Sequence, residues 1–497
     1  MYRISYLLFL FFILTGRLKS QILPSEGSKL NYRLIGFSFP ETGSQVNNYT
    51  IEIAAGDYYS EDSFKKNVIK KLPVKQNKII AEVPSFGRQY TWRAVTANNP
   101  ESRKSEFHHF STSMVPEVDT NIARLRIITP AEKYKDGYVF LDGNKALYDM
   151  NGHPVWYLPD IEGPIDYRKL RDLKISPFGT ITFLNENRQA YEINYNGDIL
   201  WKGPNTGKIS RDNTESYHHE FTRLSNGHYM VLGSKDSIVT TKSAEDSNSK
   251  RMEITTFGTV IEYDEKGKVI WSWRVADYLF SGDVIYRRIP GSKNIFDTHQ
   301  NAFYFDEKNK AVYVCFRDIS RIAKIKYPEG TVISTYGEIF KPGHWEVGNP
   351  FFCHQHSPRI SQKGYLYMYN NGCDMGTPPR VEIFQENPAE NGGLKKTWEY
   401  YCDIDGMNDP RPKVFWLGTG GNVVELPDNS MFVCMGSQFS KVFIVNMDKK
   451  ILWSAASEKW NAGNNKWECI PQYRASMITT RKEMEQLIWN AEMKKGN

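Results

Sequence analysis

The segment CHQHSPR, residues 353 to 359, places two histidines one residue apart, although the 497-residue chain contains only 10 histidines. An imidazole changes its charge near neutral pH, and it can serve as a nucleophile, a general acid or base, or a metal ligand. Which of these it does depends on the side chains that face it. The placement of the other histidines along the chain therefore matters.

Two histidines occupy equal places in a repeated pattern. His219 lies eight residues before the turn glycine Gly227, and His356 lies eight residues before the turn glycine Gly364. Equal offsets in equal repeats predict equivalent places in space, here the start of a strand far from its hairpin turn. We therefore expect both imidazoles to face one common site.

The same offset rule separates neighbouring candidates. It favours His219 over His218, and His356 over His354, although the sequence leaves both alternatives open. In the repeat before His219 the same offset falls on Arg171, a weaker candidate.

A third histidine is predicted to face an arginine. If the turn DEKNK, residues 306 to 310, is symmetric about its central residue, the hairpin places His299 opposite Arg317. The same register pairs Phe303 with Tyr313. Residues directly opposite on antiparallel strands lie a few ångströms apart. An imidazole and a guanidinium are thus expected side by side.

This set of residues favours an anion over a metal. Three histidines could hold a divalent metal, but Arg317 next to His299 places a permanent positive charge beside such a ligand set. A guanidinium binds tetrahedral anions such as sulfate or phosphate through two parallel hydrogen bonds. A nearby arginine also lowers a histidine pKa, so that the imidazole stays neutral and nucleophilic at pH 7.

Repeats along the chain predict the fold that would position these residues. An apolar strand, a polar turn, a β-branched pair and an aromatic residue recur six times, ending at Trp156, Trp201, Trp271, Tyr336, Trp398 and Trp453. A second phrase, a turn followed by an apolar strand, also occurs six times, so that each repeat offers about four strands. Repeats of this kind are typical of propeller blades. We expect an all-β protein with a six-bladed β-propeller, in which equivalent positions converge around the central axis.

The rest of the chain divides into further parts. The N-terminus has an early arginine and then a short apolar run, typical of a secretory signal peptide and too short for a confident membrane span. Alternating segments before residue 115 predict a small β-sandwich. The C-terminal segment has the capping and apolar spacing of a helix, expected to pack outside the last blade. The predicted boundaries are 1–20 (signal peptide), 21–115 (β-sandwich), 116–478 (propeller) and 479–497 (helix).

Composition excludes several functional classes. The 63 basic and 57 acidic residues are spread along the chain without a dense basic stripe, so no nucleic-acid partner is expected. The sequence lacks a P-loop and a dinucleotide-binding fingerprint, so no nucleotide cofactor is expected. No later segment approaches the roughly 20 apolar residues of a membrane-spanning helix. We expect a soluble protein, periplasmic or secreted, and the sequence leaves the oligomeric state open, a homodimer included.

Several segments resemble the bacterial aryl-sulfate sulfotransferases. The resemblance rests on an Asp-x-His-x-Asn segment followed by an arginine eighteen residues after the histidine, and on a later Gln-His pair before Asn-Gly. In this chain the segments are HHEFTRLSNGHYMVL (218 to 232), DTHQNAF (297 to 303), VCFRDIS (314 to 320), FFCHQHSPRIS (351 to 361) and YMYNNG (367 to 372).

The resemblance implies an activity and a role for each residue. It implies transfer of a sulfuryl group from a phenolic sulfate ester to a phenol, without a phosphoadenosine donor, by a ping-pong route. His356 corresponds to the transiently sulfated histidine, and His299 and Arg317 to the residues that hold the sulfuryl oxygens. His219 corresponds, less closely, to the remaining active-site histidine, which would protonate the leaving phenolate or deprotonate the acceptor.

The cysteines depart from the family pattern. Family members often carry a short-range disulfide before the sulfated histidine, but here only Cys353 lies in that region and Cys373 follows His356. That disulfide therefore does not transfer, and six cysteines allow 15 pairings.

Two other functions remain open at this point. The propeller could be a metal-dependent lyase or hydrolase acting on a polysaccharide, with the histidines holding the metal. It could also be a non-catalytic binding propeller whose axial residues only seal the channel.

Overall fold

The computed structural model describes residues 22–40, 48–96, 106–161, 170–185, 189–242, 250–279, 294–297, 299–337, 351–372, 377–387, 393–407, 419–436 and 439–491. The predicted signal peptide lies outside these residues. Internal contacts divide the chain into two compact units, Met1–Ser113 and Met114–Asn497. Within the described ranges, no helix is both long and apolar enough to cross a membrane.

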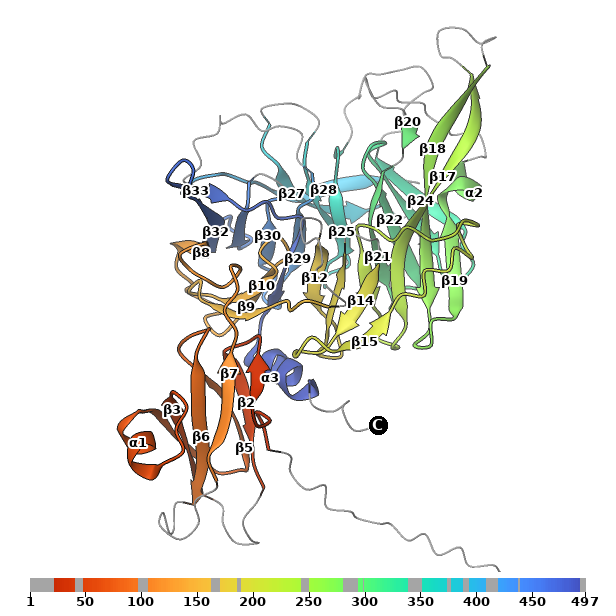
Figure 1. Ribbon diagram of the computed structural model, residues 1–497. Coiled ribbons are helices and arrows are strands. Elements are labelled where there is room, and N and C mark those ends of the chain that lie inside the picture. Colours follow the sequence, from red (N-terminus) through yellow and green to blue (C-terminus); the bar gives the residue numbers. More distant parts are fainter. Residues whose placement is uncertain are drawn as a thin grey trace, which may run out of the picture. The chain divides into compact units, whose positions relative to one another are not determined.

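Among its described residues, the first unit contains one mixed sheet, one antiparallel pair of strands and one short helix (Figure 1). One sheet has the order β1 (Ser28–Leu30), β7 (His108–Thr112), β6 (Gln89–Thr96), β3 (Tyr49–Ala55) and β4 (Val68–Val74), with β1 parallel to β7. The other pairs β2 (Leu34–Ser38) with β5 (Lys78–Glu82), and α1 spans Glu61–Lys66. The ring of Phe37 on β2 contacts those of Trp92 and Phe110 on the larger sheet, at centroid distances of 5.2 and 6.0 Å. The two sheets thus share an aromatic core.

The second unit contains six sheets among its described residues, taken here in chain order. The first consists of β11 (Pro154–Tyr157), β10 (Ala146–Asp149), β9 (Tyr138–Leu141) and β34 (Ala475–Ile478). The second consists of β12 (Arg171–Ile175), β13 (Ile181–Leu184), β14 (Ala190–Ile193) and β15 (Ile199–Lys202). The third consists of β16 (Phe221–Arg223), β17 (Tyr229–Lys242), β18 (Lys250–Tyr263) and β19 (Val269–Arg274), with β20 (Asn294–Asp297) paired to β18 and α2 (Val275–Leu279) after β19.

The remaining sheets continue this order. The fourth consists of β21 (Gln300–Asp306), β22 (Ala311–Phe316), β23 (Arg321–Lys326) and β24 (Val332–Gly337). The fifth consists of β25 (His356–Ile360), β26 (Leu366–Asn370), β27 (Arg380–Glu386) and β28 (Leu394–Tyr401). The sixth consists of β29 (Asn422–Glu425), β30 (Met431–Cys434), β31 (Lys441–Val445), β32 (Ile451–Asn461) and β33 (Lys466–Cys469), and β8 (Ala123–Thr129) pairs with β32. The prediction of an all-β protein is confirmed.

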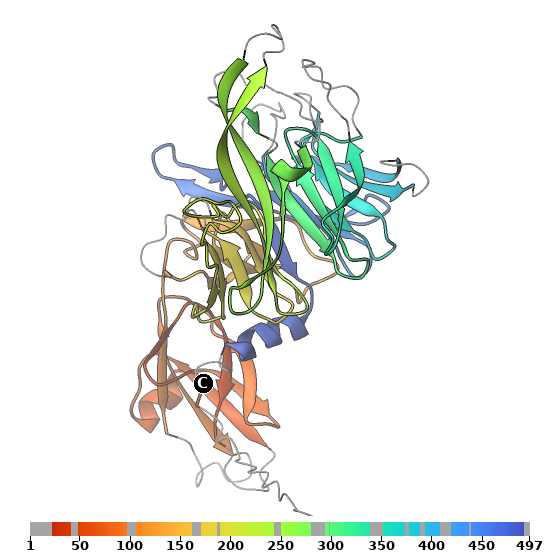
Figure 2. The same cartoon turned by 90° about the vertical axis from the view of Figure 1, so that its right-hand side faces the viewer.

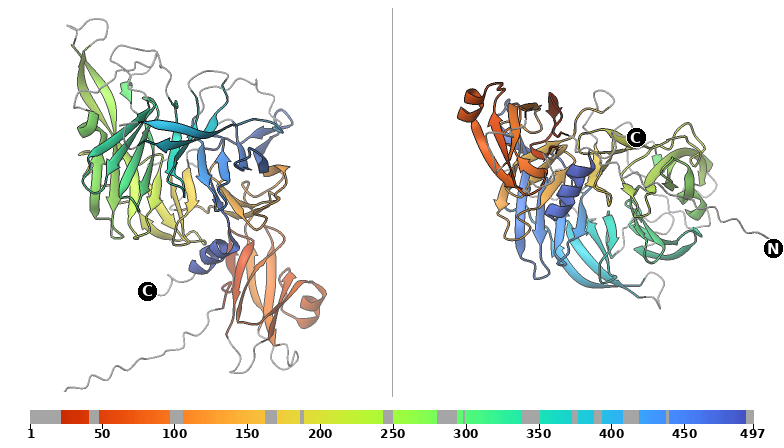
Figure 3. Two further views of the ribbon diagram at one scale, coloured as in Figure 1. Left: turned by 180° about the vertical axis from the view of Figure 1, so that it is seen from behind. Right: turned by 90° about the horizontal axis from the view of Figure 1, so that it is seen from below.

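Neighbouring sheets of the second unit contact one another in chain order. β13 contacts β16, β17 contacts β21, β21 contacts β25, and β25 contacts β29. The last strand, β34, belongs to the first sheet and contacts both β30 of the sixth sheet and β12 of the second. In Figure 1 the blue strands of the sixth sheet lie beside β8 and β9, in orange, and Figure 3 shows the same proximity from behind. The C-terminal strand therefore joins the two ends of the series of sheets.

The recurring tryptophans link one sheet to the next. Four of the five donate their indole N–H to a backbone carbonyl of the following sheet: Trp156 to Tyr195 (2.8 Å), Trp271 to Pro328 (2.8 Å), Trp398 to Met447 (2.8 Å), and Trp453 of the sixth sheet to Met150 of the first (3.0 Å). Buried indole groups need such a partner. The repeated aromatic position in the sequence thus reflects a contact between sheets.

Two elements extend from this arrangement. The strands β17 and β18 pair over 14 residues, and their hairpin projects beyond the neighbouring sheets (Figure 2). Helix α3 (Arg481–Asn490) begins at Thr480 with a capping box to Glu483. Its end bonds to turns of the second sheet, through Asn490 to Phe178 and Asn194 to Ala491. The prediction that this helix packs outside the last sheet is wrong. The preceding strand, β34, belongs to the first sheet, and the end of the helix contacts the second sheet.

Candidate active site

The three predicted histidines all lie at the start of the first strand of their sheets. His219 is two residues before β16, His299 directly precedes β21, and His356 is the first residue of β25. His219 and His299 have left-handed backbone conformations, with φ of 61° and 49°. Such values are uncommon outside glycine. The backbone therefore departs from strand geometry at these two positions.

The structure brings these side chains together around one tyrosine. The ring centroids of His219 and His299 are 5.2 Å apart. Tyr473, which precedes β34, has its ring 5.7 Å from that of His219 and 6.3 Å from that of His356. We call these four residues the histidine cluster. It draws on the first, third, fourth and fifth sheets, which agrees with the interpretation from equal sequence offsets.

Arg317 lies beside His299, as the hairpin pattern predicted. The backbone N–H of Arg317 donates to the carbonyl of His299 at 2.9 Å. The predicted register is nevertheless wrong within the strands, because the structure pairs Phe303 with Val314 and Tyr304 with Tyr313. An irregularity between Gln300 and Ala302 shifts the pairing by one residue and returns His299 to a place opposite Arg317.

A carboxylate that the sequence interpretation missed joins Arg317 and His299. Asp318 accepts a hydrogen bond from Arg317 Nη1 at 2.6 Å, and its other oxygen is 3.6 Å from His299 Nδ1. Burial alone would raise the pKa of Asp318, but His299 and Arg317 hold it well below its usual range. Arg317 Nε is buried and has no hydrogen-bond partner among the described residues. One edge of the guanidinium therefore remains available for an anion.

His356 is held in a single tautomer by its neighbours. Its Nε2 accepts a hydrogen bond from the backbone N–H of Gly420 at 3.1 Å, so Nε2 carries the lone pair. The proton is then on Nδ1, which donates to the carbonyl of His354 at 3.1 Å. The amide of Asn371, 2.9 Å from Nδ1, donates its own two protons to the carbonyls of His354 and Gly420. Before Nε2 can attack a sulfur atom, the Gly420 N–H must release it.

The surroundings keep His356 and His219 neutral. The pKa of His356 lies well below 6.5, first because the ring is buried (1 % exposed) and then because of the charges of Arg317 and Arg474. The pKa of His219 is likewise lowered, by burial and then by His218 and Arg171. A neutral imidazole has the lone pair that a nucleophile or a general base needs.

The alternatives left open by the sequence lie close to the site. His218 bonds to His219 through their Nδ1 atoms, 2.6 Å apart, while His219 makes the ring contacts with His299 and Tyr473. His354 is buried, and its Nδ1 donates to the carbonyl of Gly372 at 3.2 Å. The guanidinium of Arg171 lies 4.6 Å from the centre of the Tyr473 ring.

The cysteines near His356 differ from those elsewhere. Cys353, three residues before His356, is disulfide-bonded, and Cys373 lies outside the described residues. The other four cysteines, Cys315, Cys402, Cys434 and Cys469, are free and buried.

The described residues contain no group of three or more His, Cys, Asp or Glu side chains arranged to hold a metal ion. The histidines instead lie beside Arg317 and the Tyr473 ring, and Arg171 lies against that ring. This arrangement provides hydrogen-bond donors and positive charge, which suit an anion.

Sequence reasoning missed four further residues of the site. Asp318 follows Arg317 directly and could have been found from that adjacency. Tyr473 and Arg474 directly precede β34, which pairs with β9 of the first sheet. Recognising in the sequence that the C-terminal strand joins the first sheet would have located both residues. Gly420 carries no chemical group beyond its backbone, so no residue-type argument could have selected it.

Gly420 offers a test of the contact that holds Nε2 of His356. Its φ is +76°, and a Cβ would lie 2.8 Å from both Cδ2 and the carbonyl oxygen of Tyr473. We expect Gly420→Ala to displace this segment and to lower activity as well as the free energy of unfolding. Gly364→Ala is the matched control, because its φ is +80° with nothing within 4 Å. The control should show only the backbone cost of about 1–2 kcal/mol in a denaturation experiment, with activity retained. Equal losses of activity in both variants would contradict the expectation.

Comparison with known proteins adds an independent line of evidence. No curated protein matches the sequence. Solved structures with some similarity include a protein of unknown function from Bacteroides caccae, with 12 % identity, a TM-score of 0.39, and coverage of 69 % of this chain and 98 % of that one. Another is AztD from Citrobacter koseri, with 9 % identity, a TM-score of 0.31, and coverage of 87 % and 98 %. Similarity at this level supports no conclusion about fold or function.

The family comparison is informative. Residues 129–386, just over half of the chain, match the family described as Arylsulfotransferase (ASST). The matched region includes His219, His299, Arg317 and His356, which were selected from spacing and then found in one cluster. The chain belongs to the arylsulfotransferase family, whose members are enzymes that transfer sulfuryl groups.

Proposed function

We propose that the protein moves a sulfuryl group from a phenolic sulfate ester to a phenol through a covalent sulfohistidine at His356. The observation that carries the proposal is the tautomer of His356. Its Nε2 lone pair lies on a buried, neutral ring, and the charge of Arg317 acts on that ring. A cation with an available edge next to a neutral nucleophile suits an anionic electrophile.

The first half of the reaction follows from these groups. Nε2 of His356 attacks sulfur, the bond from sulfur to the aryl oxygen breaks, and phenolate leaves with that electron pair. Arg317 and His299 hold the remaining sulfuryl oxygens, on which charge is spread in the transition state. Asp318 accepts a hydrogen bond from Nη1 of Arg317, while Nε of Arg317 has no hydrogen-bond partner among the described residues.

The second half reverses these bonds with a new phenol. The phenol oxygen attacks sulfur, the bond from sulfur to Nε2 breaks, and His356 regains its lone pair. His219 is the candidate base for the phenol proton, because its lowered pKa keeps it neutral. The proton that His219 gains in this step is passed to the leaving phenolate in the first half of the next turnover. The route is ping-pong.

The architecture and location are part of the same proposal. The contacts between successive sheets, and β34 shared between the two ends of the series, support a closed six-bladed propeller. The N-terminal pattern supports a signal peptide over residues 1–20 and therefore export to the periplasm or the medium. An exported enzyme would have no access to a cytosolic nucleotide donor.

The pH dependence of activity should report the lowered pKa of His356. An imidazolium has no lone pair, so activity is lost as pH falls through the pKa of His356. Because that pKa is well below 6.5, the acid limb of the kcat/KM profile should lie well below pH 6.5. The sulfate ester keeps its charge throughout this range. An acid limb at or above pH 6.5, with the fold intact by circular dichroism, would contradict a buried neutral nucleophile.

A simple assay tests the proposed function as a whole. Release of nitrophenol from nitrophenyl sulfate is expected to depend on an added phenol, with aryl sulfate formed from that phenol in equal amount. Release at the same rate without a phenol would indicate a hydrolase, and no release with any phenolic acceptor would argue against the proposal.

A further inference from the structure

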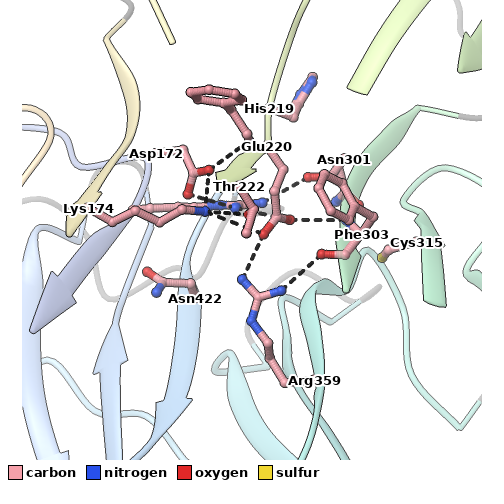
Figure 4. Close-up of polar contacts among 12 residues, drawn as sticks. Asp172, Lys174, His219, Glu220, Thr222, Asn301, Phe303, Cys315, Arg359 and Asn422 are labelled. Atoms are coloured by element: carbon pink, nitrogen blue, oxygen red, sulfur yellow. Dashed lines mark hydrogen bonds and ion pairs between the residues drawn. The ribbon is translucent and has the colours of Figure 1, made fainter. Parts of the chain in front are cut away.

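Directly next to the histidine cluster lies a group of buried charges that the mechanism above does not use (Figure 4). We call it the charge cluster; it consists of Asp172, Lys174, Glu220, Arg359 and Arg474. Asp172, Glu220 and Arg474 are almost completely buried, and the side chains of Lys174 and Arg359 are about four-fifths buried. Charges are rarely buried without partners, because removing them from water is costly.

Glu220 makes more of these contacts than any other member of the cluster. Its Oε1 accepts from Arg359 Nη2 at 2.7 Å and lies 3.9 Å from Lys174 Nζ. Its Oε2 accepts from the backbone N–H of Phe303 at 3.0 Å and lies 3.1 Å from Arg474 Nη1. One carboxylate thereby bonds to the second, fourth and fifth sheets and to the segment before β34.

Glu220 and three of its four partners each lie within a few residues of a member of the histidine cluster on the same segment, whereas Lys174 does not. The pairs are Glu220 with His219, Phe303 with His299, Arg359 with His356, and Arg474 with Tyr473. A shift of the Glu220 carboxylate would therefore change the positions of all four members of the histidine cluster. The strands β12, β16, β21 and β25 belong to four different sheets, and among the described residues no backbone pairing joins them to one another. Side-chain contacts of this kind must set their spacing.

Arg359 and Arg474 extend these connections to the backbone. Arg359 Nη1 donates to the carbonyl of Phe303 at 2.9 Å, and Arg474 Nη2 donates to the carbonyl of Asn301 at 3.0 Å. Arg474 Nη1 also lies 3.1 Å from Asp172 Oδ1, and Lys174 Nζ lies 2.7 Å from Asp172 Oδ2. Glu220 and Asp172 together face three cations.

The charges also matter for the nearby histidines. Two carboxylates and three cations leave one unit of positive charge in excess. Despite burial, the three cations hold the pKa of Glu220 at about 2, so it is ionised throughout the working range. The groups that face His356 are Arg317, Arg474, His354 and His299, together with the Tyr473 ring. Removing the charge of Glu220 would leave Arg474 less compensated next to His356.

We propose that Glu220 is a positioning residue of the sulfuryl-transfer site, and that its carboxylate sets the mutual spacing of His219, His299 and His356. The inference rests on the proposed function for its kinetic consequences. The predicted change in the spacing of the histidine rings can be measured by crystallography even if the protein shows no activity.

Two substitutions separate position from charge. Glu220→Asp keeps the charge but withdraws the carboxylate by about 1.5 Å, one carbon–carbon bond, so it cannot keep all its contacts. We expect kcat to fall about 100-fold, the loss associated with a 1 Å misplacement, while KM and the acid limb of the pH profile stay nearly unchanged. Glu220→Gln keeps the length and removes the charge. Here kcat should fall and the acid limb should move to lower pH, because the added positive charge lowers the pKa of His356 further.

Glu192 provides a matched control. It is as buried as Glu220 and also binds an arginine and a hydroxyl, Arg223 Nη1 and Tyr229 Oη, each at 2.5 Å. Both belong to the third sheet, so Glu192 reaches the segment that carries His219 through Arg223 but not those that carry His299, His356 or Tyr473. Glu192→Asp and Glu192→Gln should lower the denaturation midpoint as much as the Glu220 variants do, yet retain kcat per folded molecule.

The experiment measures kcat, KM and their pH profiles for all four variants per folded protein, with crystal structures of the wild type and Glu220→Asp. The inference predicts a larger separation than the 5.2 Å between the His219 and His299 rings in Glu220→Asp. Unchanged ring separation with wild-type kcat in both Glu220 variants would overturn it. Equal loss of kcat in the Glu192 variants would also overturn it, because the effect would then be general destabilisation. If the wild type itself lacked sulfotransferase activity, the proposed function would fail, and the ring separation alone would decide the role of Glu220.

Discussion

Replacing His356 by asparagine is expected to abolish sulfuryl transfer and covalent labelling while the protein stays folded. Asparagine can keep a hydrogen bond near Gly420 but has no nucleophilic nitrogen, so the covalent route is closed. Loss of a nucleophile in a covalent mechanism costs several orders of magnitude in rate. Steady-state turnover of nitrophenyl sulfate with a phenol, together with the denaturation midpoint, measures both parts of the expectation.

The neighbouring histidine is the natural control. His354 lies two residues away and is also buried, but its Nδ1 donates to the carbonyl of Gly372. His354→Asn should retain covalent labelling, although its activity can fall: the substitution removes the bond from His354 Nδ1 to the carbonyl of Gly372, and the backbone carbonyl of residue 354 accepts from Nδ1 of His356. Labelling that disappears in His354→Asn and persists in His356→Asn would show that the nucleophile was assigned to the wrong ring.

The second large effect is expected for Arg317→Ala. The guanidinium is the cation whose charge acts most strongly on His356, and its Nε has no hydrogen-bond partner within the described residues. Removing a donor that stabilises transition-state charge costs about 100- to 1000-fold in rate. Because transition-state charge is affected, kcat/KM should fall more than the affinity for the donor. Single-turnover formation of the covalent intermediate gives this value directly.

Arg317→Lys refines this expectation. A lysine keeps the charge but cannot present two parallel N–H groups, so the substitution is not conservative at a bidentate site. Its rate should lie between those of the wild type and Arg317→Ala. Full activity in Arg317→Ala would count heavily against the anion pocket. Equal loss in both variants would show that the fork geometry, rather than the charge, carries the effect.

Sequence patterns were sufficient to predict the strands and the grouping of the histidines. The tryptophan repeat was informative because four of its five indoles donate a hydrogen bond to the next sheet, as Trp453 does to the carbonyl of Met150. Equal offsets from Gly227 and Gly364 selected residues that the structure places around Tyr473. Each of these patterns lies within a single repeat, so the strand and turn geometry of that repeat is enough to place the residue.

The details that the sequence could not supply depend on contacts between distant segments. The irregularity between Gln300 and Ala302 changes the register of the hairpin, and no turn residue indicates it. Gly420 acts through its backbone N–H alone, 64 residues after His356. Glu220 joins four segments through one carboxylate, and a single sequence does not reveal which distant side chains face it. These contacts form only when the sheets are assembled.

The most direct test of the central claim is mass spectrometry of the protein after brief exposure to nitrophenyl sulfate without an acceptor. The account predicts one added sulfuryl group on the peptide that contains His356, absent in His356→Asn and lost from the wild type when a phenol is added. Turnover without any covalent adduct, or an adduct on a different residue that is chased by the phenol, would contradict it.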